Sequence, residues 1–358
     1  MANVNWRAGD WVEVRTKEEI LRTLDKKGQL DGLPFMPQMF NYCGKRFQVY
    51  KRAHKTCDTV NQTGGRWLTD GIHLDLRCDG QAYGGCQAAC LLFWKTAWLK
   101  PVEGASGQAE SITAPTTAMP ATCTEADVWS GTRQPGQDSS DPAYVCQATQ
   151  VPAATTLLKW YDIRQYVEDV TSRNTRIATI LRGVLYATFY NLSRLGIGLG
   201  PPLRWFYDKF QTWRGGLPYP RKRGVIPKGE RTPTETLNLQ PGELVRVKPY
   251  EAILATLDTD NKNRGLFFDA EAVPFCGGTF RVHSRVSRIL DERTGKLVKL
   301  KNESIILEGV YCQARYSDCR MFCPRAIYSY WREIWLERVP EIRGRQGGGK
   351  EPHRADRT

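Results

Sequence analysis

An internal repeat is the feature that most constrains the fold of this chain. A constant offset of 233 residues aligns Gly9–Ala53 with Gly242–Val286 without a gap. The alignment holds 17 identities in 45 positions, whereas unrelated sequences of ordinary composition would give about three. The match ends with Phe93–Val102 over Tyr330–Val339. Each copy is therefore a structural unit of about 95 residues, produced by duplication.

Each copy has the pattern of a small β-rich domain. An alternating strand, Trp11–Arg15 or Leu244–Lys248, leads into a short helix with apolar residues at helical spacing. A second strand, Arg46–Tyr50 or Thr279–His283, follows a Cys-Gly turn, and Ile289–Val298 in the second copy is typical of a hairpin. The fold class expected is α+β, with tandem duplicated small β-rich domains joined by a linker and a helical segment.

Two stretches resemble known families. The Gly-Asp-x-Val-x-Val opening at Gly9–Val14 and the closing Trp/Leu-Glu strand resemble SH3-like barrels such as the β subunit of nitrile hydratase. The resemblance implies SH3-like folds for both repeats and carries over no catalytic residue. The ending formed by Phe322–Arg325 and Tyr330–Val339 is similar to that of an uncharacterised bacterial family, often encoded in biosynthetic gene clusters.

Composition shifts divide the chain further. Between the repeats lies a stretch rich in Ala, Ser, Thr, Gly and Pro, which buries too little apolar surface to fold alone. The boundaries expected are a first Cys-rich SH3-like repeat at 1–102, a linker with Cys123 and Cys146 at 103–156, a basic helical segment at 157–240, a second Cys-rich SH3-like repeat at 241–340 and a disordered tail at 341–358.

Positive charge is concentrated in the basic segment. The chain has 51 Lys+Arg and 38 Asp+Glu, a net charge of +13. Residues Leu157–Gln240 contain 14 Lys+Arg and 6 Asp+Glu, so +8 of that charge lies there. This predicts a polyanion as a partner of Leu157–Gln240. A helix over Asn174–Leu195 is expected to dock between the repeats, the alternative being an anionic membrane surface.

The chain shows no run of 18 uncharged apolar residues and no apolar leader at its start. Neither a membrane span nor a secretory signal is therefore expected, and the cytoplasm is the compartment predicted. Eleven cysteines in such a chain favour metal or thiol chemistry over a disulfide framework, because cytosolic thiols are kept reduced.

Four cysteines recur in each repeat, and four thiolates complete a tetrahedral metal site. The absence of C-x2-C spacing leans towards an iron–sulfur cluster, with zinc as the alternative. Buried apolar thiols and disulfides are the other interpretations. The predicted metal ligands are Cys43, Cys78, Cys86 and Cys90 in the first repeat, and Cys276, Cys312, Cys319 and Cys323 in the second.

Three further cysteines have no counterpart in the other repeat. With two nearby histidines they could form a third site or a reactive thiol pair, and they could equally be two linker cysteines and one surface cysteine. The residues of this candidate third site are Cys57, Cys123, Cys146, His54 and His73.

These features predict a cytoplasmic cysteine-ligated metalloprotein, most simply an iron–sulfur protein acting as a redox or substrate-activating component of a biosynthetic pathway. Whether it is itself an enzyme stays open, and no catalytic residue can be assigned. No P-loop, dinucleotide fingerprint, HExxH or GxSxG motif occurs. The alternative is a zinc-stabilised or metal-free binding module for a polyanion, a carrier protein or a partner enzyme.

Overall fold

The structure is a computed structural model that describes residues 5–102, 122–136, 140–196, 198–317 and 319–340. The chain divides into two compact units. Unit 1 contains Met1–Asn174, Arg288–Leu300 and Asp318–Ile327, and unit 2 contains Thr175–Ser287, Lys301–Ser317 and Tyr328–Thr358. Residues 103–121 and 137–139 of the predicted linker, and the predicted disordered tail at 341–358, lie outside the described residues.

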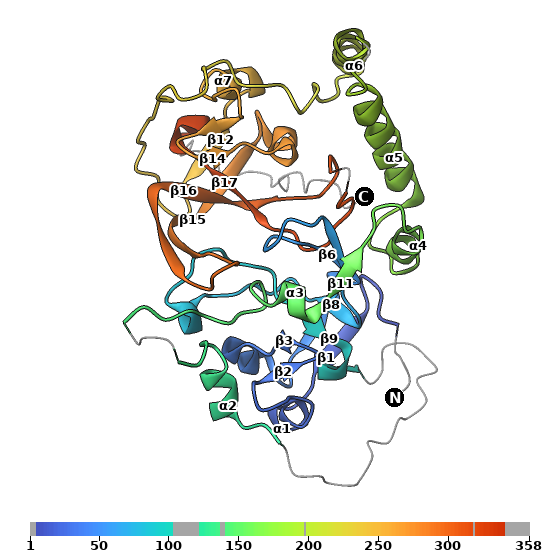
Figure 1. Cartoon of the computed structure of the whole chain (residues 1–358), viewed down its shortest axis with the longest axis vertical. Coiled ribbons are helices and arrows are strands. Elements are labelled where there is room, and N and C mark those ends of the chain that lie inside the picture. The colour runs from blue at the N-terminus through green and yellow to red at the C-terminus, as the bar shows by residue number, and fades with distance from the viewer. Residues whose placement is uncertain (1–4, 103–121, 137–139, 197, 318, 341–358) are drawn as a thin grey trace, which may run out of the picture. The chain divides into compact units, whose positions relative to one another are not determined.

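Unit 1 is built from short strands and short helices (Figure 1). Its strands are β1 (Trp11–Val14), β2 (Gln29–Leu30), β3 (Leu33–Pro34), β4 (Arg46–Gln48), β5 (Lys51–Arg52), β6 (Lys55–Cys57), β7 (Gly65–Trp67), β8 (Gly71–His73), β9 (Trp94–Lys95), β10 (Leu99–Pro101) and β11 (Thr156–Leu158). Its helices are α1 (Lys17–Leu21), α2 (Glu125–Ser130), α3 (Val151–Ala154) and α4 (Arg164–Thr171), with 3₁₀ helices η1 (Pro37–Tyr42), η2 (Gln81–Tyr83) and η3 (Thr96–Trp98).

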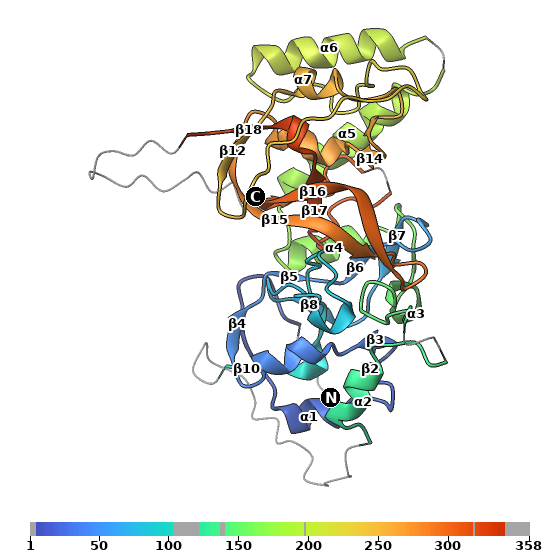
Figure 2. The same cartoon turned by 90° about the vertical axis from the view of Figure 1, so that its left-hand side faces the viewer.

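Unit 2 begins with two longer helices and continues with the second repeat (Figure 2). Its helices are α5 (Ile177–Leu192), α6 (Gly200–Trp213) and α7 (Tyr250–Leu254), with 3₁₀ helices η4 (Ala270–Phe275) and η5 (Glu333–Trp335). Its strands are β12 (Leu244–Val247), β13 (Lys262–Asn263), β14 (Leu266–Phe267), β17 (Tyr328–Trp331) and β18 (Leu336–Arg338). Two long strands, β15 (Thr279–Leu290) and β16 (Leu297–Tyr311), belong mostly to unit 2 and have their adjoining ends in unit 1.

The fold is α+β, with several small antiparallel sheets and a few helices. In unit 1 the described sheets have the strand orders β10-β1-β4, β11-β7-β6, β5-β8-β9 and β2-β3. The five-stranded sheet has the order β17-β16-β15-β12-β18, beside the pair β13-β14. Most strands are only two to four residues long, so packing of side chains between sheets and helices must supply much of the stability.

The two sequence repeats form equivalent strand pairs. Val12 of β1 lies opposite Phe47, and Val245 of β12 lies opposite Phe280. Each first strand also pairs with the last strand of its own repeat, β10 or β18. The duplicated sequence therefore directs the same local topology twice.

Buried tryptophans occupy matching places in the two cores. Trp98 Nε1 donates to Thr23 Oγ1 at 3.1 Å, and Trp335 Nε1 donates to Thr256 Oγ1 at 2.9 Å. Both indoles are fully buried and pack with the apolar strand residues of their own repeat. A buried indole N–H needs a partner, and the threonine hydroxyl supplies it in each copy.

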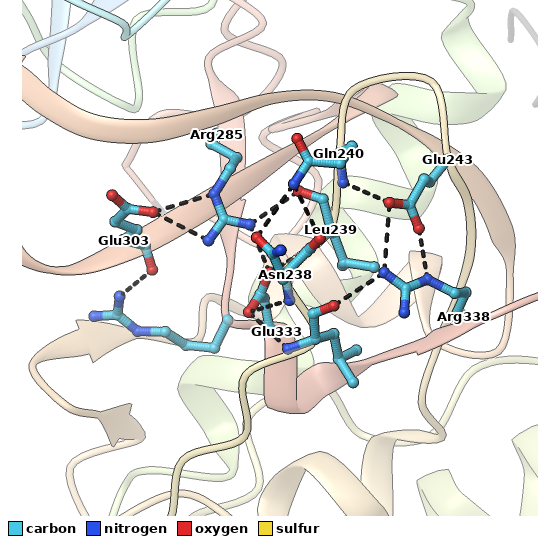
Figure 3. Close-up of polar contacts among 10 residues, drawn as sticks. Asn238, Leu239, Gln240, Glu243, Arg285, Glu303, Glu333 and Arg338 are labelled. Carbon is cyan, nitrogen blue, oxygen red and sulfur yellow. Dashed lines mark hydrogen bonds and ion pairs between the residues drawn. The ribbon is translucent and has the colours of Figure 1, made fainter.

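A charged network fixes the chain where the basic segment enters the second repeat (Figure 3). The carboxylate of Glu333 accepts hydrogen bonds from the backbone N–H groups of Leu237 and Leu239, both at 2.9 Å, and from Arg285 at 2.7 Å. Arg338 holds the Leu237 carbonyl at 2.9 Å and pairs with Glu243 at 2.6 Å. This irregular segment is therefore held by side chains instead of a sheet.

Candidate functional site

A small cavity in unit 1 is surrounded by thiols. Its volume is about 30 Å³, and its lining includes Cys78, Cys86, Cys90 and Cys146. A space of this size holds about one water molecule. The cavity is therefore too small for an organic substrate.

Backbone and amide groups fix two of these sulfurs. Cys78 Sγ accepts hydrogen bonds from Gln38 Nε2 at 3.2 Å and from the Gly80 backbone N–H at 3.3 Å, while Cys86 Sγ accepts from the Leu290 backbone N–H at 3.3 Å. Gly80 has φ 70°, and a Cβ there would lie 1.8 Å from the Cys86 carbonyl oxygen. The close approach of these two turns therefore requires glycine.

Burial keeps three thiols of this cavity, those of Cys78, Cys90 and Cys146, protonated at neutral pH. It raises the pKa of Cys78 to about 12 and that of Cys146 to about 11, and it raises the pKa of Cys90 well above its ordinary value. Metal ligation needs the thiolate form. The described residues contain no group of three or more His, Cys, Asp or Glu side chains arranged to hold a metal ion.

The predicted metal ligands are distributed as follows. Three members of the first set line the cavity together with Cys146, but Cys43 is not among the lining residues and lies at the end of η1. Of the second set, Cys276 and Cys312 lie in unit 2, whereas Cys319 and Cys323 lie in unit 1. The four-thiolate iron–sulfur or zinc centre in each repeat therefore stays a prediction.

Cys57 is paired with a cysteine from the second sequence repeat. A side-chain hydrogen bond joins Cys57, at the end of β6, to Cys323, and both residues are buried. That hydrogen bond lowers the pKa of Cys57, burial opposes the shift, and the positive charges of Arg325 and Arg320 reinforce it. A thiol stabilised as thiolate in this way is the reactive kind.

Arg325 links this thiol pair to the cavity. Its guanidinium donates to the Cys57 carbonyl at 3.2 Å and to Thr59 Oγ1 at 2.8 Å, lies 3.9 Å from Cys57 Sγ and pairs with Glu292 at 3.2 Å. Arg325 and Glu292 also line the cavity. The buried guanidinium therefore places a compensated positive charge beside the sulfur.

Three other residues of the predicted third site make contacts of their own with backbone carbonyls. Cys123 is buried before α2, and its thiol faces the backbone carbonyl of Thr124. His73 Nδ1 bonds the Leu92 carbonyl at 2.8 Å, and His54 Nε2 bonds the Gln165 carbonyl at 3.1 Å. Burial lowers the pKa of each histidine to about 3, so both are neutral and serve the packing of unit 1.

A buried ion pair lies beside His54. Lys55 Nζ is 2.5 Å from Asp169 Oδ2, and both side chains are almost fully buried. Burial lowers the pKa of Lys55 and raises that of Asp169 to about 6, while their mutual attraction acts in the opposite direction on each. The pair joins β6 to α4 and so anchors the strand that ends in Cys57.

Unit 2 contains a much larger groove with a cationic lining. Its volume is about 690 Å³, within the range of small-molecule sites. Five cations and two carboxylates line it, namely Arg194, Arg204, Arg221, Lys222, Arg223, Asp208 and Asp260. The excess of three positive charges favours an anionic ligand.

Aromatic rings orient the arginines of the groove. The Arg221 guanidinium lies 4.5 Å from the ring centre of Tyr190, and that of Arg194 lies 5.0 Å from the same ring. Arg204 stacks 5.3 Å from the ring of Tyr219. Stacking fixes each planar guanidinium while leaving in-plane N–H donors available to a ligand.

The arginine-bearing loop is tied to the second repeat. Asn261 accepts from the Gly224 backbone N–H at 2.8 Å and donates to the Lys222 carbonyl at 2.9 Å. Lys222 Nζ also pairs with Asp208 of α6 at 3.1 Å. The loop therefore presents its cations from a fixed backbone.

Sequence reasoning placed the excess charge within 157–240 but did not identify this groove. The consecutive cations Arg221, Lys222 and Arg223 were the available signal. The aromatic partner of Arg221, Tyr190, lies in α5, so only the fold shows that these groups surround one space. The pairing of Cys57 with Cys323 was likewise missed.

No helix among the described residues is long and apolar enough to cross a membrane. No family model matches the chain, and no curated protein is similar to it.

Proposed function

We propose that this chain is a binding protein for a small anionic molecule carrying phosphate or several carboxylate groups, held in the cationic groove of unit 2. The observation that carries the proposal is the convergence of five cationic side chains on one groove of about 690 Å³. Guanidinium groups bind phosphate and carboxylate oxygens through paired hydrogen bonds, and stacking on tyrosine reduces the entropy lost on binding.

The size and openness of the groove favour a small ligand over an extended polymer. The lining carboxylates are engaged, since Asp208 pairs with Lys222 and Asp260 pairs with Lys228 at 2.8 Å. Arg204 and Arg223 are exposed and so can reach an incoming anion. The two carboxylates of the groove are therefore already neutralised by lysines. Its guanidinium groups remain as hydrogen-bond donors around a bound ligand.

Calorimetric titration of the full chain with inorganic pyrophosphate tests this function. The Arg204→Ala and Arg223→Ala variants should each bind pyrophosphate about tenfold more weakly, because each loses a charge-assisted hydrogen bond. Arg231→Ala is the matched control, since Arg231 is an exposed arginine of the same segment outside the groove lining. An equal loss of pyrophosphate affinity in Arg231→Ala would reject the proposal. So would unchanged affinity in a variant that combines Arg204→Ala with Arg223→Ala.

A second candidate function is thiol redox chemistry at Cys57 and Cys323, favoured by their hydrogen bond beside Arg325. With hydrogen peroxide as oxidant, the Cys57 thiolate would attack one peroxide oxygen, forming a sulfenic acid and releasing water after protonation. The Cys323 sulfur would then displace the remaining oxygen as water. The two thiols lose two protons and two electrons, and peroxide is reduced to two waters.

Peptide mapping without reductant after peroxide treatment tests this chemistry. We expect a disulfide-linked peptide pair containing Cys57 and Cys323, which Cys57→Ser abolishes and Cys123→Ser leaves unchanged. Finding both cysteines as unlinked thiols under conditions that oxidise a surface thiol would contradict it. Iron, sulfide and zinc analysis of the anaerobically purified protein addresses the predicted metal centre separately.

We also infer that the repeats are tandem SH3-like barrels and that the protein acts in the cytoplasm. The equivalent pairing of β1 and β12 with their neighbours supports the first inference. The cysteines lining the small cavity are free thiols and form no disulfide, which suits a reducing compartment and supports the second.

A further inference from the structure

Helix α5 turns its apolar face outward. Ile177, Leu181 and Leu185 are exposed by 62, 64 and 71%, and Val184 and Leu192 on the same face are exposed as well. At about 100° per residue these five side chains form one stripe along the helix. The opposite face contains the buried Gly183 and Tyr190. Among the described residues of unit 2, nothing covers the aliphatic stripe.

Helix α6 continues the exposed apolar surface with aromatic side chains. Phe206 and Trp213 are exposed by 63 and 82%, and Trp205 and Phe210 are also exposed. Lys209 projects from the same face, between Trp205 and Trp213 in the helical order. Figure 1 shows α5 at the edge of unit 2 and α6 end-on next to it, and Figure 2 shows α6 lengthwise.

The charge of this region is almost wholly of one sign. Residues 175–216 contain six Lys+Arg and a single acid, Asp208. Two of these cations, Arg194 and Arg204, line the groove, so four remain outside it, namely Arg176, Arg182, Lys209 and Arg214. Asp208 pairs with Lys222 and lines the groove, so it does not neutralise the exposed face. An apolar face with Trp and Phe, flanked by Lys and Arg, has the composition of helices that lie in the headgroup region of a bilayer.

We infer that α5 and α6 form a membrane-docking surface that lies in the interface of a bilayer containing anionic phospholipids. The aliphatic stripe and the aromatic rings would enter the boundary between headgroups and acyl chains. Arg182 and Lys209 have long stems that let their charges remain among the phosphates. A second copy of the chain fits less well, because a symmetric contact would bring two surfaces of the same positive charge together.

This surface and the proposed ligand groove use opposite faces of the same helices. Tyr190 lies on the side of α5 opposite its aliphatic stripe, and Arg204 and Asp208 lie away from the exposed aromatics of α6. Membrane docking would therefore leave the groove open to a water-soluble anion. The inference stands on different side chains from those of the proposed function.

Vesicle flotation of the full-length protein tests the inference. We expect binding to phosphatidylcholine vesicles that contain phosphatidylglycerol, weaker binding to pure phosphatidylcholine, and a marked decrease at about 0.5 M salt. Leu181→Gln with Leu185→Gln, and separately Phe206→Gln with Trp213→Gln, should each reduce partitioning about tenfold or more. Trp129→Gln is the control, because it removes an exposed tryptophan of α2 in unit 1.

Three results would overturn the inference. These are no binding to phosphatidylglycerol vesicles, unchanged binding in both paired variants, and a wild-type dimer that the paired variants convert to monomers without any vesicle binding. Circular dichroism confirms that the variants are folded. Pyrophosphate titration of the same variants should be unchanged, which separates failure of membrane docking from failure of ligand binding.

Discussion

Lys55 and Asp169 carry opposite charges in a buried position, and each charge depends on the other for its stabilisation. Substitution of either residue should therefore destabilise the fold. Lys55 and Asp169 are 2.5 Å apart, and the ammonium also lies 5.0 Å from the ring centre of Tyr166. Because water is excluded, neither charge can be solvated if its partner is removed. We expect Asp169→Asn to lower the free energy of unfolding by about 3–5 kcal/mol, measured by urea denaturation.

The control for this prediction is Asp162→Asn, just before α4. Asp162 pairs with an exposed arginine, Arg164, whose side chain is 82% exposed. Solvent screens this surface pair, so its loss should leave unfolding nearly unchanged. Equal effects of the two substitutions would show that Lys55 and Asp169 do not behave as a buried ion pair.

Glu333 gives unit 2 a stability that depends on pH. Burial alone would raise the pKa of its carboxyl, but hydrogen bonds from the backbone of Leu239 and Leu237 and from Arg285 lower it. The ionised form is therefore favoured in the folded state. Its contribution is complete above the ordinary carboxyl pKa of 4.5 and is lost as the pH falls through the lower folded-state pKa.

Glu333→Gln should therefore cost about 1–3 kcal/mol at neutral pH and progressively less below about pH 4. Urea denaturation of the variant and the wild-type protein across this range measures the difference. Glu337→Gln on the exposed side of β18 is the control. A cost that does not change with pH would show that the carboxylate charge is not the cause.

At the scale of elements, the loop 221–224 depends on one glycine. A Cβ on Gly224 would lie 2.4 Å from the carbonyl oxygens of both Leu257 and Asp258. Backbone atoms cannot withdraw as a flexible side chain can, so Gly224→Ala should displace the loop, cost about 1–3 kcal/mol and weaken pyrophosphate binding. Val225→Ala changes an exposed neighbour and should affect neither unfolding nor titration.

Local elements were predictable where a periodic pattern determined them. The alternating strand at Trp11–Arg15 became β1, and the helix expected over Asn174–Leu195 became α5. The outward direction of the α5 stripe could not be predicted, because periodicity identifies an apolar face without showing what covers it. The same limit applies to the cysteines, since spacing cannot show that Cys146 lies beside Cys78.

At the scale of the whole molecule, unit 1 is assembled from three separate stretches of the chain. Arg288–Leu300 and Asp318–Ile327 return to it after long excursions. Leu290 joins its hydrophobic core, and Arg325 reaches Cys57 across 268 positions in sequence. Contacts at such separations leave no periodic signal in a single sequence, which is why neither the thiol pair nor the composition of this unit could be derived from motifs.

The discontinuity of unit 1 predicts that residues 1–174 do not fold cooperatively alone. Without Arg288–Leu300 and Asp318–Ile327 this fragment lacks the Leu290 side chain of its core and the guanidinium beside Cys57, so we expect weak, non-cooperative urea unfolding by circular dichroism. In the intact chain Leu290→Ala should cost about 2–5 kcal/mol, because it leaves a cavity. Val298→Ala, on the exposed part of β16, should cost far less. If fragment 1–174 unfolds as sharply as the intact chain, Arg288–Leu300 and Asp318–Ile327 are not needed for unit 1 to fold. The core formed by residues 1–174 would then offset the conformational entropy of the chain without them.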